Sequence, residues 1–177
     1  TPEAVEVLFD KKINLNIAIL TISDSRTMDD DKSGNLLCDL VNGSNHHIYE
    51  RNIVKDDIYE IRKVISSWIY NSDINVIIST GGTGVTGRDG TPEAVEVLFD
   101  KKIEGFGEIF RYLSFKKIKT STIQSRAVAG VANSTYIFCL PGSPSACKDA
   151  WVDIIQYQLD STNKPCNLVE LMPRLKD

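Results

Sequence analysis

The sequence lacks a basic tract, and it lacks an apolar run long enough to cross a membrane. Its 20 Lys and Arg residues are outnumbered by 24 Asp and Glu residues, so the formal net charge is −4. Proteins that bind bulk nucleic acid concentrate Lys and Arg on one face, and a membrane-spanning helix needs about 20 mostly apolar residues. We therefore expect neither nucleic acid nor a membrane as a partner. No signal peptide is visible either, which predicts a cytoplasmic protein.

Cysteine and histidine are also scarce. The four cysteines are Cys38, Cys139, Cys147 and Cys166. They contain no C-x-x-C pair, and the two histidines, His46 and His47, are adjacent, so the spacing fits no zinc site. We interpret the cysteines as reduced structural thiols.

The remaining composition is that of an ordinary globular protein, with 177 residues of which 42% are apolar. This length fits one domain, which we place at residues 14–167. Residues 168–177 are predicted to be a C-terminal tail, because the chain becomes polar from Asp160 onward. Residues 1–13 (TPEAVEVLFDKKI) repeat residues 91–103 letter for letter. An old structural repeat would have diverged, so we expect the first copy to lie outside the functional fold.

Strands and helices alternate along the chain. Short runs of β-branched residues predict strands at residues 16–22, 47–54, 75–80 and 135–140. Helical spacing and capping residues predict helices after Ser33, at 58–70, from Thr91, at 108–115 and at 145–159, with a partly helical segment at 124–131. This order predicts an α/β fold with a mostly parallel sheet covered on both faces. Ligands then bind beyond the carboxyl ends of the strands, where the loops after Ile22, Thr80 and Leu140 are expected.

A glycine loop follows the strand that ends at Thr80. Gly81, Gly82 and Gly84 let backbone N–H groups approach an anion closely, and Thr80 and Thr83 add hydroxyl groups. The helix predicted to start next presents an N-terminus that favours negative charge. The segment therefore predicts a site for a phosphate or another compact polar ligand.

The same loop contains a G-x-G-x-x-G match at Gly82, Gly84 and Gly87. In a dinucleotide-binding fold the helix opens within that motif, whereas here Arg88-Asp89-Gly90 still precede the predicted helix. A Walker A loop is absent from the sequence. We therefore do not favour a nicotinamide-cofactor site.

Several polar residues lie where they could serve the same crevice. Asp89 could hold Mg²⁺ against a phosphate, or it could simply cap the turn before Thr91. Ser23 and Asp24 end the first strand, where Asp24 could face the crevice but is more readily explained as a turn residue. Ser143 could cap the last helix or contact a phosphate. The run at residues 29–31 (Asp-Asp-Asp) is interpreted as a solvated loop.

Four motifs in order resemble a known family. They are TGGTGVTGRDGTPEA (80–94), EGFGEIFRYLSF (104–115), SRAVAGVAN (125–133) and LPGSPSACKDAW (140–151). Together they resemble the molybdenum cofactor biosynthesis protein B family, which is close to the molybdopterin adenylyltransferases. The resemblance covers about residues 14–167.

The resemblance implies a three-layer α/β/α fold and a homo-oligomer, either a trimer or a hexamer. It implies that molybdopterin binds near the glycine loop, with Asp89 as the carboxylate that follows the loop and Ser143 as the phosphate contact. Adenylyltransferase relatives join ATP and molybdopterin with Mg²⁺, releasing pyrophosphate. Arg88 would help to neutralise charge in such a transfer.

One position departs from those relatives. They tend to carry Pro-Asp-Glu after the second strand, whereas this chain reads Val54-Lys55-Asp56-Asp57. Lys55 falls where the acid would be, although Asp56 could substitute for it. Two hypotheses follow: a Mg²⁺-dependent molybdopterin adenylyltransferase, and a non-catalytic molybdopterin-binding or carrier oligomer. A third hypothesis, an unrelated nucleotide-binding α/β domain, holds only if the match to the four motifs is a coincidence.

Overall fold

The computed structural model describes residues 12–176. The first copy of the duplicated segment, expected to lie outside the fold, therefore falls almost entirely outside the described residues. At its end, the Lys12 ammonium pairs with the Asp160 carboxylate at 3.0 Å, and the Ile13 amide donates to the Ser161 hydroxyl at 2.9 Å. The second copy forms a helix, a short 3-10 turn and an edge strand.

Within the described residues the strands form one six-stranded sheet in the order β2-β1-β3-β6-β5-β4. The strands are β1 (Asn16–Ile22), β2 (His47–Val54), β3 (Val76–Thr80), β4 (Lys101–Lys102), β5 (Val128–Ala132) and β6 (Thr135–Leu140). In sheet order, β2, β1, β3 and β6 pair in parallel. β5 and then β4 extend the sheet beyond β6 in antiparallel pairing. The sheet is thus mostly parallel.

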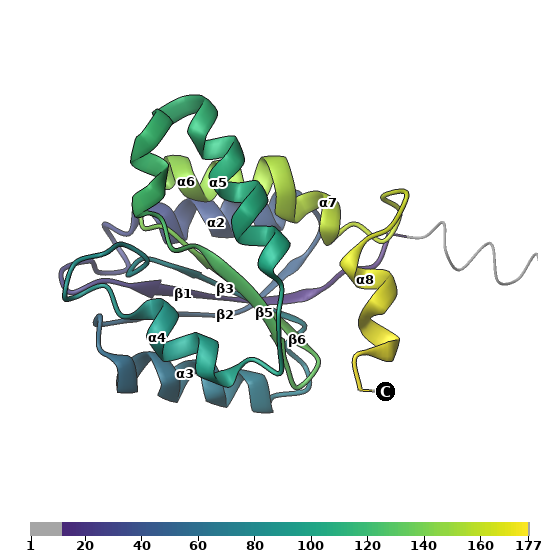
Figure 1. Ribbon diagram of the computed structural model, residues 1–177. Helices are drawn as coiled ribbons and strands as arrows, with labels where there is room; N and C mark the ends of the chain where they lie inside the picture. Colours follow the sequence, from purple (N-terminus) through teal and green to yellow (C-terminus); the bar gives the residue numbers. More distant parts are fainter. Residues whose placement is uncertain (1–11, 177) are drawn as a thin grey trace, which may run out of the picture.

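Helices cover both faces of this sheet (Figure 1). The helices are α2 (Lys32–Gly43), α3 (Ile58–Tyr70), α4 (Thr91–Val95), α5 (Glu104–Ile118), α6 (Pro144–Ala150), α7 (Gln156–Gln158) and α8 (Leu168–Leu171). Figure 1 places α2, α5 and α6 on one face and α3 and α4 on the other. This arrangement confirms the predicted α/β/α fold class.

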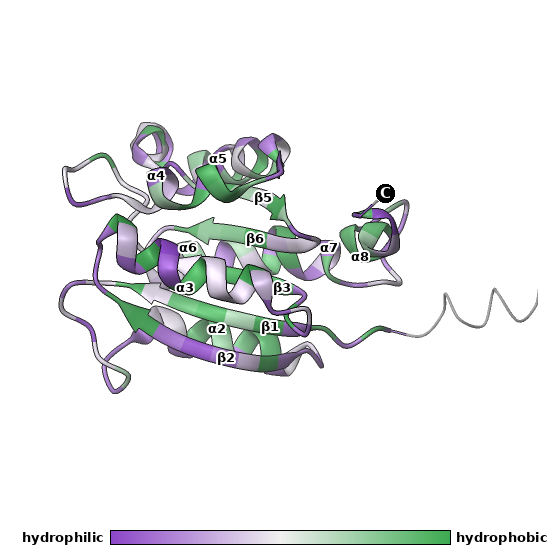
Figure 2. Cartoon of the chain, turned by 90° about the horizontal axis from the view of Figure 1, so that it is seen from below, coloured by the Kyte–Doolittle hydropathy of each residue, from purple (hydrophilic) through white to green (hydrophobic). Residues whose placement is uncertain are grey.

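The two faces of β1 belong to different hydrophobic clusters. Ile17 and Ile19 pack with α2, α5 and α6, whereas Ala18 and Leu20 pack with α3 and α4. Successive side chains of a strand point to opposite faces, so a strand buried on both faces is mostly apolar along its length. Figure 2 shows this along the central strands, while the edge strand β2 carries hydrophilic residues over much of its length.

The segment at residues 124–131, predicted to be partly helical, is instead the strand β5 in its second half. A two-residue turn joins β5 to β6, with Asn133 and Ser134 at φ angles of 46° and 68°. Such left-handed turns match the twist of a hairpin. Gly130 lies in β5 because a Cβ there would come within 2.4 Å of the Phe99 ring. Tertiary pairing therefore overrides the weak local pattern.

Two predicted helix caps were also wrong. The cap of α2 is Asp31, whose carboxylate accepts from the Gly34 amide, and not Ser33, which lies inside the helix. The cap of α4 is Gly90, while Thr91 is buried in the first turn and donates its hydroxyl to the carbonyl of Gly81. The two residues that were predicted as caps, Ser33 and Thr91, instead hydrogen-bond within the site described below.

The C-terminal segment does not form the polar surface extension that the sequence suggested. Asn167 caps α8, and Val169 is buried against the main hydrophobic cluster. The Tyr136 hydroxyl of β6 donates to the carbonyl of Leu168 at 2.7 Å. A few apolar residues in this polar stretch are enough to pack the segment against the rest of the fold. Among the described residues, no helix has the length and apolar character needed to span a membrane.

Candidate functional site

The predicted meeting of three loops is confirmed. The segments after β1, β3 and β6 surround a pocket of about 630 Å³ at the carboxyl ends of the parallel strands. Its lining includes ten of the residues predicted for the site: Ser23, Asp24, Asp56, Thr80, Gly81, Gly82, Thr83, Gly84, Asp89 and Ser143. Arg88, the eleventh, bonds to Asp24 beside the pocket. The opposite wall comes from α5 and the 3-10 turn η2 (Lys119–Gln124), a contribution that the sequence did not indicate.

The glycine loop needs glycine at its first two positions. Gly81 and Gly82 have φ angles of 110° and 66°, a region that L side chains rarely adopt. A Cβ on Gly81 would lie 2.1 Å from the Ile22 carbonyl oxygen, and one on Gly82 would lie 2.3 Å from the Thr91 hydroxyl. The loop therefore runs directly over β1 and α4 and keeps its backbone open to the pocket.

Hydrogen bonds fix the two ends of this loop. The Gly81 amide donates to the Leu140 carbonyl at 2.9 Å, and the Thr91 amide donates to the Gly82 carbonyl at 3.0 Å. The amides of Gly82 and Thr83 donate to no protein acceptor within residues 12–176. Thr83 is buried, and both residues line the pocket. Two free amides at a buried bend form a site suited to an anion.

Three carboxylates, which we call the rim carboxylates, border the pocket: Asp24, Asp56 and Asp89. The Gly90 amide donates to Asp56 at 3.1 Å, and the Asp56 amide donates to Asp24 at 3.2 Å. The Arg88 guanidinium holds both oxygens of Asp24, at 3.0 and 2.5 Å. The predicted turn role and the predicted site position of Asp24 are therefore compatible.

Asp89 closes the exposed end of the glycine loop. Its Oδ2 accepts from the Thr86 amide at 2.8 Å and from the Thr86 hydroxyl at 2.6 Å. A Cβ on Gly84 would approach that oxygen to 2.6 Å. Asp89 thus shapes its own turn, as one of the two alternatives expected, and it still lines the pocket.

The rim carboxylates differ in acidity. Hydrogen bonds from the Thr86 hydroxyl lower the pKa of Asp89, and the Arg88 guanidinium lowers the pKa of Asp24. Burial raises the pKa of Asp56, and the nearby charges of Asp89 and Asp24 raise it further. Asp56 is therefore the rim group that most readily holds a proton or gains from a bound cation.

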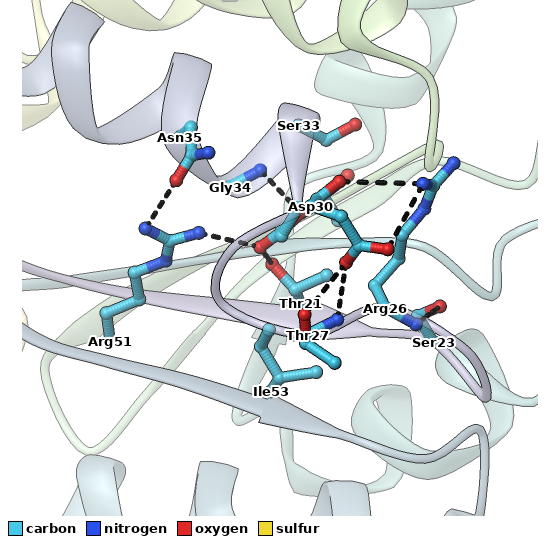
Figure 3. A network of polar contacts seen from close by, with 12 residues as sticks. Thr21, Ser23, Arg26, Thr27, Asp30, Ser33, Gly34, Asn35, Arg51 and Ile53 are labelled. Carbon is cyan, nitrogen blue, oxygen red and sulfur yellow. Dashed lines mark hydrogen bonds and ion pairs between the residues drawn. The ribbon is translucent and has the colours of Figure 1, made fainter.

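The buried side of the pocket carries a second polar group, which we call the floor network: Thr21, Asp31 and Arg51. Asp31 is only 1% exposed, so its interpretation as part of a solvated run was wrong. Its Oδ2 accepts from the Thr21 hydroxyl at 2.6 Å and from Arg51 at 2.9 Å. Figure 3 shows Arg51 donating also to Asn35 on α2. The network ties β1, β2 and α2 together beneath the pocket.

The Pro-Gly-Ser turn forms the third side. The Ser143 hydroxyl accepts from the Ala146 amide at 3.2 Å and so caps α6, as one alternative expected. The buried Ser33 hydroxyl donates to the Gly142 carbonyl at 2.7 Å, and Thr80 donates to the Pro141 carbonyl at 2.9 Å. Ser143 remains exposed at the pocket edge.

The G-x-G-x-x-G match does not have the geometry of a dinucleotide site. Three residues, Arg88 to Gly90, separate Gly87 from α4, which begins only at Thr91. The strand before the loop is β3, in the middle of the sheet. The loop therefore bends back over the strand ends before any helix begins.

Comparisons with known proteins agree on one family. A family model described as a probable molybdopterin binding domain matches residues 18–161. The chain is 53% identical over 155 residues to molybdenum cofactor biosynthesis protein B of Escherichia coli K12, covering 88% of this chain and 91% of that protein. It is 46% identical over 149 residues to the protein of the same name from Staphylococcus epidermidis, covering 82% and 85%.

The chain belongs to the molybdenum cofactor biosynthesis protein B family.

Solved structures support this membership. A crystal structure of molybdenum cofactor biosynthesis protein B matches with a TM-score of 0.85 and 36% identity, covering 94% of this chain and 99% of that chain. The tungsten cofactor synthesizing protein MoaB from Pyrococcus furiosus matches with a TM-score of 0.77 and 29% identity, covering 93% and 98%. The resemblance stated from the four motifs is confirmed. The chain has a role in molybdenum cofactor biosynthesis, and molybdopterin fits its matched domain as a ligand.

In this family member the residue after β2 is Lys55, which is exposed and lies outside the pocket lining. The next residue, Asp56, directs its carboxylate into the site, since Oδ1 accepts from the Gly90 amide and Oδ2 lies 2.7 Å from the Cβ position of Gly82. The acidic side chain that follows β2 in the site therefore comes from Asp56, one position after Lys55.

The donor set suits a hard cation that is shared with a phosphate ligand. Among residues 12–176, no group of three His, Cys, Asp or Glu side chains is arranged to hold a metal by itself. Mg²⁺ is usually held by one or two carboxylates together with substrate phosphates and water. Asp56 and Asp89 provide such carboxylates beside the free loop amides. The residues present therefore fit Mg²⁺ only as part of a phosphate complex.

Sequence reasoning missed Asp31 and Arg126, both of which hold the site together. A cap signal was available for Asp31, because aspartate is among the residues preferred at the N-cap of a helix. No local signal identified Arg126, whose partners lie about 40 residues away in the glycine loop.

Proposed function

We propose that the protein is a molybdopterin adenylyltransferase that uses ATP and Mg²⁺. In this reaction a terminal phosphate oxygen of molybdopterin forms a bond to the α-phosphorus of ATP. The bond from that phosphorus to the bridging oxygen breaks, and pyrophosphate leaves with its electron pair. The products are adenylyl-molybdopterin and pyrophosphate.

The observation that carries the proposal is the pair of free backbone amides, Gly82 and Thr83, opposite carboxylates at one pocket edge. Amides suit phosphate oxygens, whereas carboxylates alone would repel them. A site that joins both needs a cation, which is the usual arrangement for phosphoryl transfer. Family membership in molybdenum cofactor biosynthesis supports molybdopterin as one of the two ligands.

Residue roles follow from this arrangement. Gly81 to Gly84 would bind a phosphate through the backbone, with Thr80 fixing the Pro-Gly-Ser turn and Ser143 donating at its edge. Asp89 and Asp56 would hold Mg²⁺, which supplies charge neutralisation at the phosphates when bound. Arg88, now paired with Asp24, would exchange partners toward a ligand phosphate. Ser23 would orient the loop that carries Asp24, since its hydroxyl accepts from the Arg26 amide at 3.1 Å.

The second candidate is a non-catalytic molybdopterin carrier. Lys55 favours it, because adenylyltransferase relatives tend to carry an acid at that position. Asp56 supports the first candidate, because its carboxylate and not the Lys55 ammonium borders the pocket. We infer that the offset acid preserves the catalytic arrangement.

We also propose that the protein is a homo-oligomer, either a trimer or a hexamer. Exposed apolar residues lie on α5, where Ile109, Tyr112, Phe115 and Ile118 are 48–62% exposed. Burial of such surface against a second copy would be favourable. Light scattering of the purified protein measures the mass directly, and a monomer at micromolar concentration would contradict this proposal.

The deciding experiment is pyrophosphate release from ATP in the presence of molybdopterin and Mg²⁺. We expect Asp89→Asn to reduce the rate on the order of 100- to 1,000-fold, because a carboxylate that holds a cation at a transferring phosphate acts mainly by electrostatic stabilisation. The amide keeps an oxygen that can accept from Thr86, so the turn should remain formed. Asp29→Asn is the matched control, since Asp29 is exposed and borders no part of the pocket.

The outcomes separate the two candidates. Loss of release in Asp89→Asn with a parental rate in Asp29→Asn supports the transferase. A parent that binds molybdopterin but releases no pyrophosphate supports the carrier. Full activity in Asp89→Asn would remove this residue from the mechanism.

A further inference from the structure

Arg126 lies in the short segment between the 3-10 turn η2 and β5, and its side chain is one-third exposed. It makes an unusual set of bonds to the glycine loop. Nε donates to the Gly84 carbonyl at 2.6 Å, and Nη2 donates to the Asp89 carbonyl at 2.8 Å. Nη1 pairs with the Glu93 carboxylate on α4, and the Arg126 amide donates to the Thr83 carbonyl at 2.9 Å.

These bonds join both ends of the exposed part of the loop. Residues 85–88 are exposed. They are flanked by Gly84 and Asp89, whose carbonyls accept the two bonds from the guanidinium. Two other contacts stabilise this part: the Thr86 amide donates to the Asp89 carboxylate and closes the turn, and the Arg88 guanidinium donates to the Asp24 carboxylate at the surface. The Arg88–Asp24 pair holds this part at the surface and leaves the two carbonyls at its ends to Arg126. Arg126 is therefore the side chain that attaches the turn to the rest of the fold.

The chemistry of the side chain suits this task. A guanidinium presents planar, fixed donors that can bond to two acceptors at a set spacing, whereas a lysine ammonium is a point charge on a flexible stem. Carbonyl oxygens at residues 84 and 89 accept bonds only where the loop is folded as observed. The bonds to the carbonyls of Thr83 and Gly84 also hold the chain directly after the free amides of Gly82 and Thr83.

We propose that Arg126 is a positioning residue for the site, which holds the glycine loop and Asp89 in the ligand-binding arrangement without touching the ligand. Its effect on turnover rests on the proposed adenylyl transfer. Its effect on loop order and molybdopterin affinity does not, because a carrier would need the same loop.

The test compares Arg126→Lys and Arg126→Ala with Arg111→Lys in the full chain. Arg111 is a matched control, because its guanidinium lies on the same side of the loop and donates at 3.0 Å to the carbonyl of Ala127, one residue from Arg126. Three quantities are measured: hydrogen exchange of the amides of residues 81–90, affinity for molybdopterin, and the KM and kcat of pyrophosphate release. Circular dichroism checks that each variant is folded.

We expect both Arg126 variants to show faster exchange in residues 81–90, with parental exchange in the central strands. Molybdopterin affinity should fall by roughly tenfold, and kcat should fall by about 100-fold, the scale of a 1 Å misplacement of reacting groups. The KM for ATP should change less than kcat. Arg126→Lys should not rescue kcat, because the ammonium cannot hold both carbonyls, and Arg111→Lys should match the parent.

Other results overturn the proposal. Parental exchange and parental affinity in both Arg126 variants would show that the loop does not depend on the guanidinium. Full rescue by Arg126→Lys would show that only the charge matters. If the parent itself releases no pyrophosphate, the adenylyl transfer fails, while exchange and affinity still decide the role of Arg126.

Discussion

The rim carboxylates and the floor network border the same pocket, yet they contain the same residue type in opposite surroundings. The rim residues Asp24 and Asp56 bond to loop amides and remain partly open to water. The floor residue Asp31 is 1% exposed and has its bonds to Thr21, Gly34 and Arg51 inside the fold. Burial therefore separates structural aspartates from those that can contact a ligand. Rim changes should therefore alter function, and floor changes should alter stability.

The largest effect is expected in the floor network. Asp31→Ala removes the cap of α2 and leaves the Arg51 charge half-buried without its carboxylate. Breaking a buried pair in this way costs about 3 kcal/mol or more. Urea unfolding should show this loss in the free energy of unfolding.

Asp29→Ala is the control for that change. Asp29 is exposed two positions earlier in the same loop, and an exposed substitution usually stays within about 0.5 kcal/mol. An Asp31→Ala variant as stable as Asp29→Ala would contradict the distinction between floor and rim.

A smaller effect is expected where the glycine loop meets the rim. Gly82→Ala places a Cβ 2.7 Å from Asp56 Oδ2 and 2.3 Å from the Thr91 hydroxyl, at a φ of 66°. We expect a loss of stability of about 1–3 kcal/mol from the strained backbone, together with loss of molybdopterin binding. Thermal unfolding and a binding titration measure the two effects.

Gly43→Ala provides the comparison, because a Cβ there meets nothing within 4 Å at the end of α2. It should be neutral or slightly stabilising. If Gly82→Ala behaved like Gly43→Ala and kept its affinity, the loop would tolerate side chains and the free amides would lose their explanation.

The smallest effect distinguishes two rim residues by the sign of their pH dependence. The Arg88 guanidinium lowers the pKa of Asp24, so the ionised form stabilises the fold above pH 3.8, and this contribution is lost as pH falls through the folded pKa. Burial raises the pKa of Asp56, so its contribution is present below pH 3.8 and is lost as pH rises through the folded pKa. Asp24→Asn should thus be less stable than the parent at pH 7, and Asp56→Asn more stable.

Urea unfolding of both variants between pH 3 and pH 7 measures this difference. Asp56→Asn should approach the parent at the acid end, because the parent Asp56 carboxyl is then protonated like the neutral amide, whereas Asp24→Asn should do so only as pH falls through the lowered pKa of Asp24. The same sign for both variants at pH 7 would contradict the opposite environments of the two residues.

The parallel half of the fold was predictable because each strand carries its own signal. The runs at β1 and β3 are mostly apolar and rich in β-branched residues, since both faces are buried. The antiparallel edge was not predictable in the same way. β5 reads Val-Ala-Gly-Val-Ala, and β4 has only Lys101 and Lys102. Their pairing depends on β6 and on the packing of Phe99 against Gly130, which no local pattern contains.

The site divides in a similar way. The glycine loop and the three loop positions followed from the sequence, because parallel strands bring their carboxyl ends to one edge. The floor role of Asp31 did not follow, since three adjacent aspartates look alike until one is buried. The opposite wall from α5 and η2 also escaped notice, because those residues are separate in the sequence from the three loops and meet the pocket only in the folded chain.

The family, the mostly parallel α/β core and the glycine loop follow from the sequence, because they depend on local patterns and motif order. The folded chain was needed to show which aspartates face the pocket, that Asp56 and not Lys55 borders it, and that Arg126 bonds to the loop. Those outcomes depend on burial and on bonds between residues tens of positions apart. The sequence lists the hydrogen-bond donors and acceptors, but the tertiary fold determines which of them lie within bonding distance.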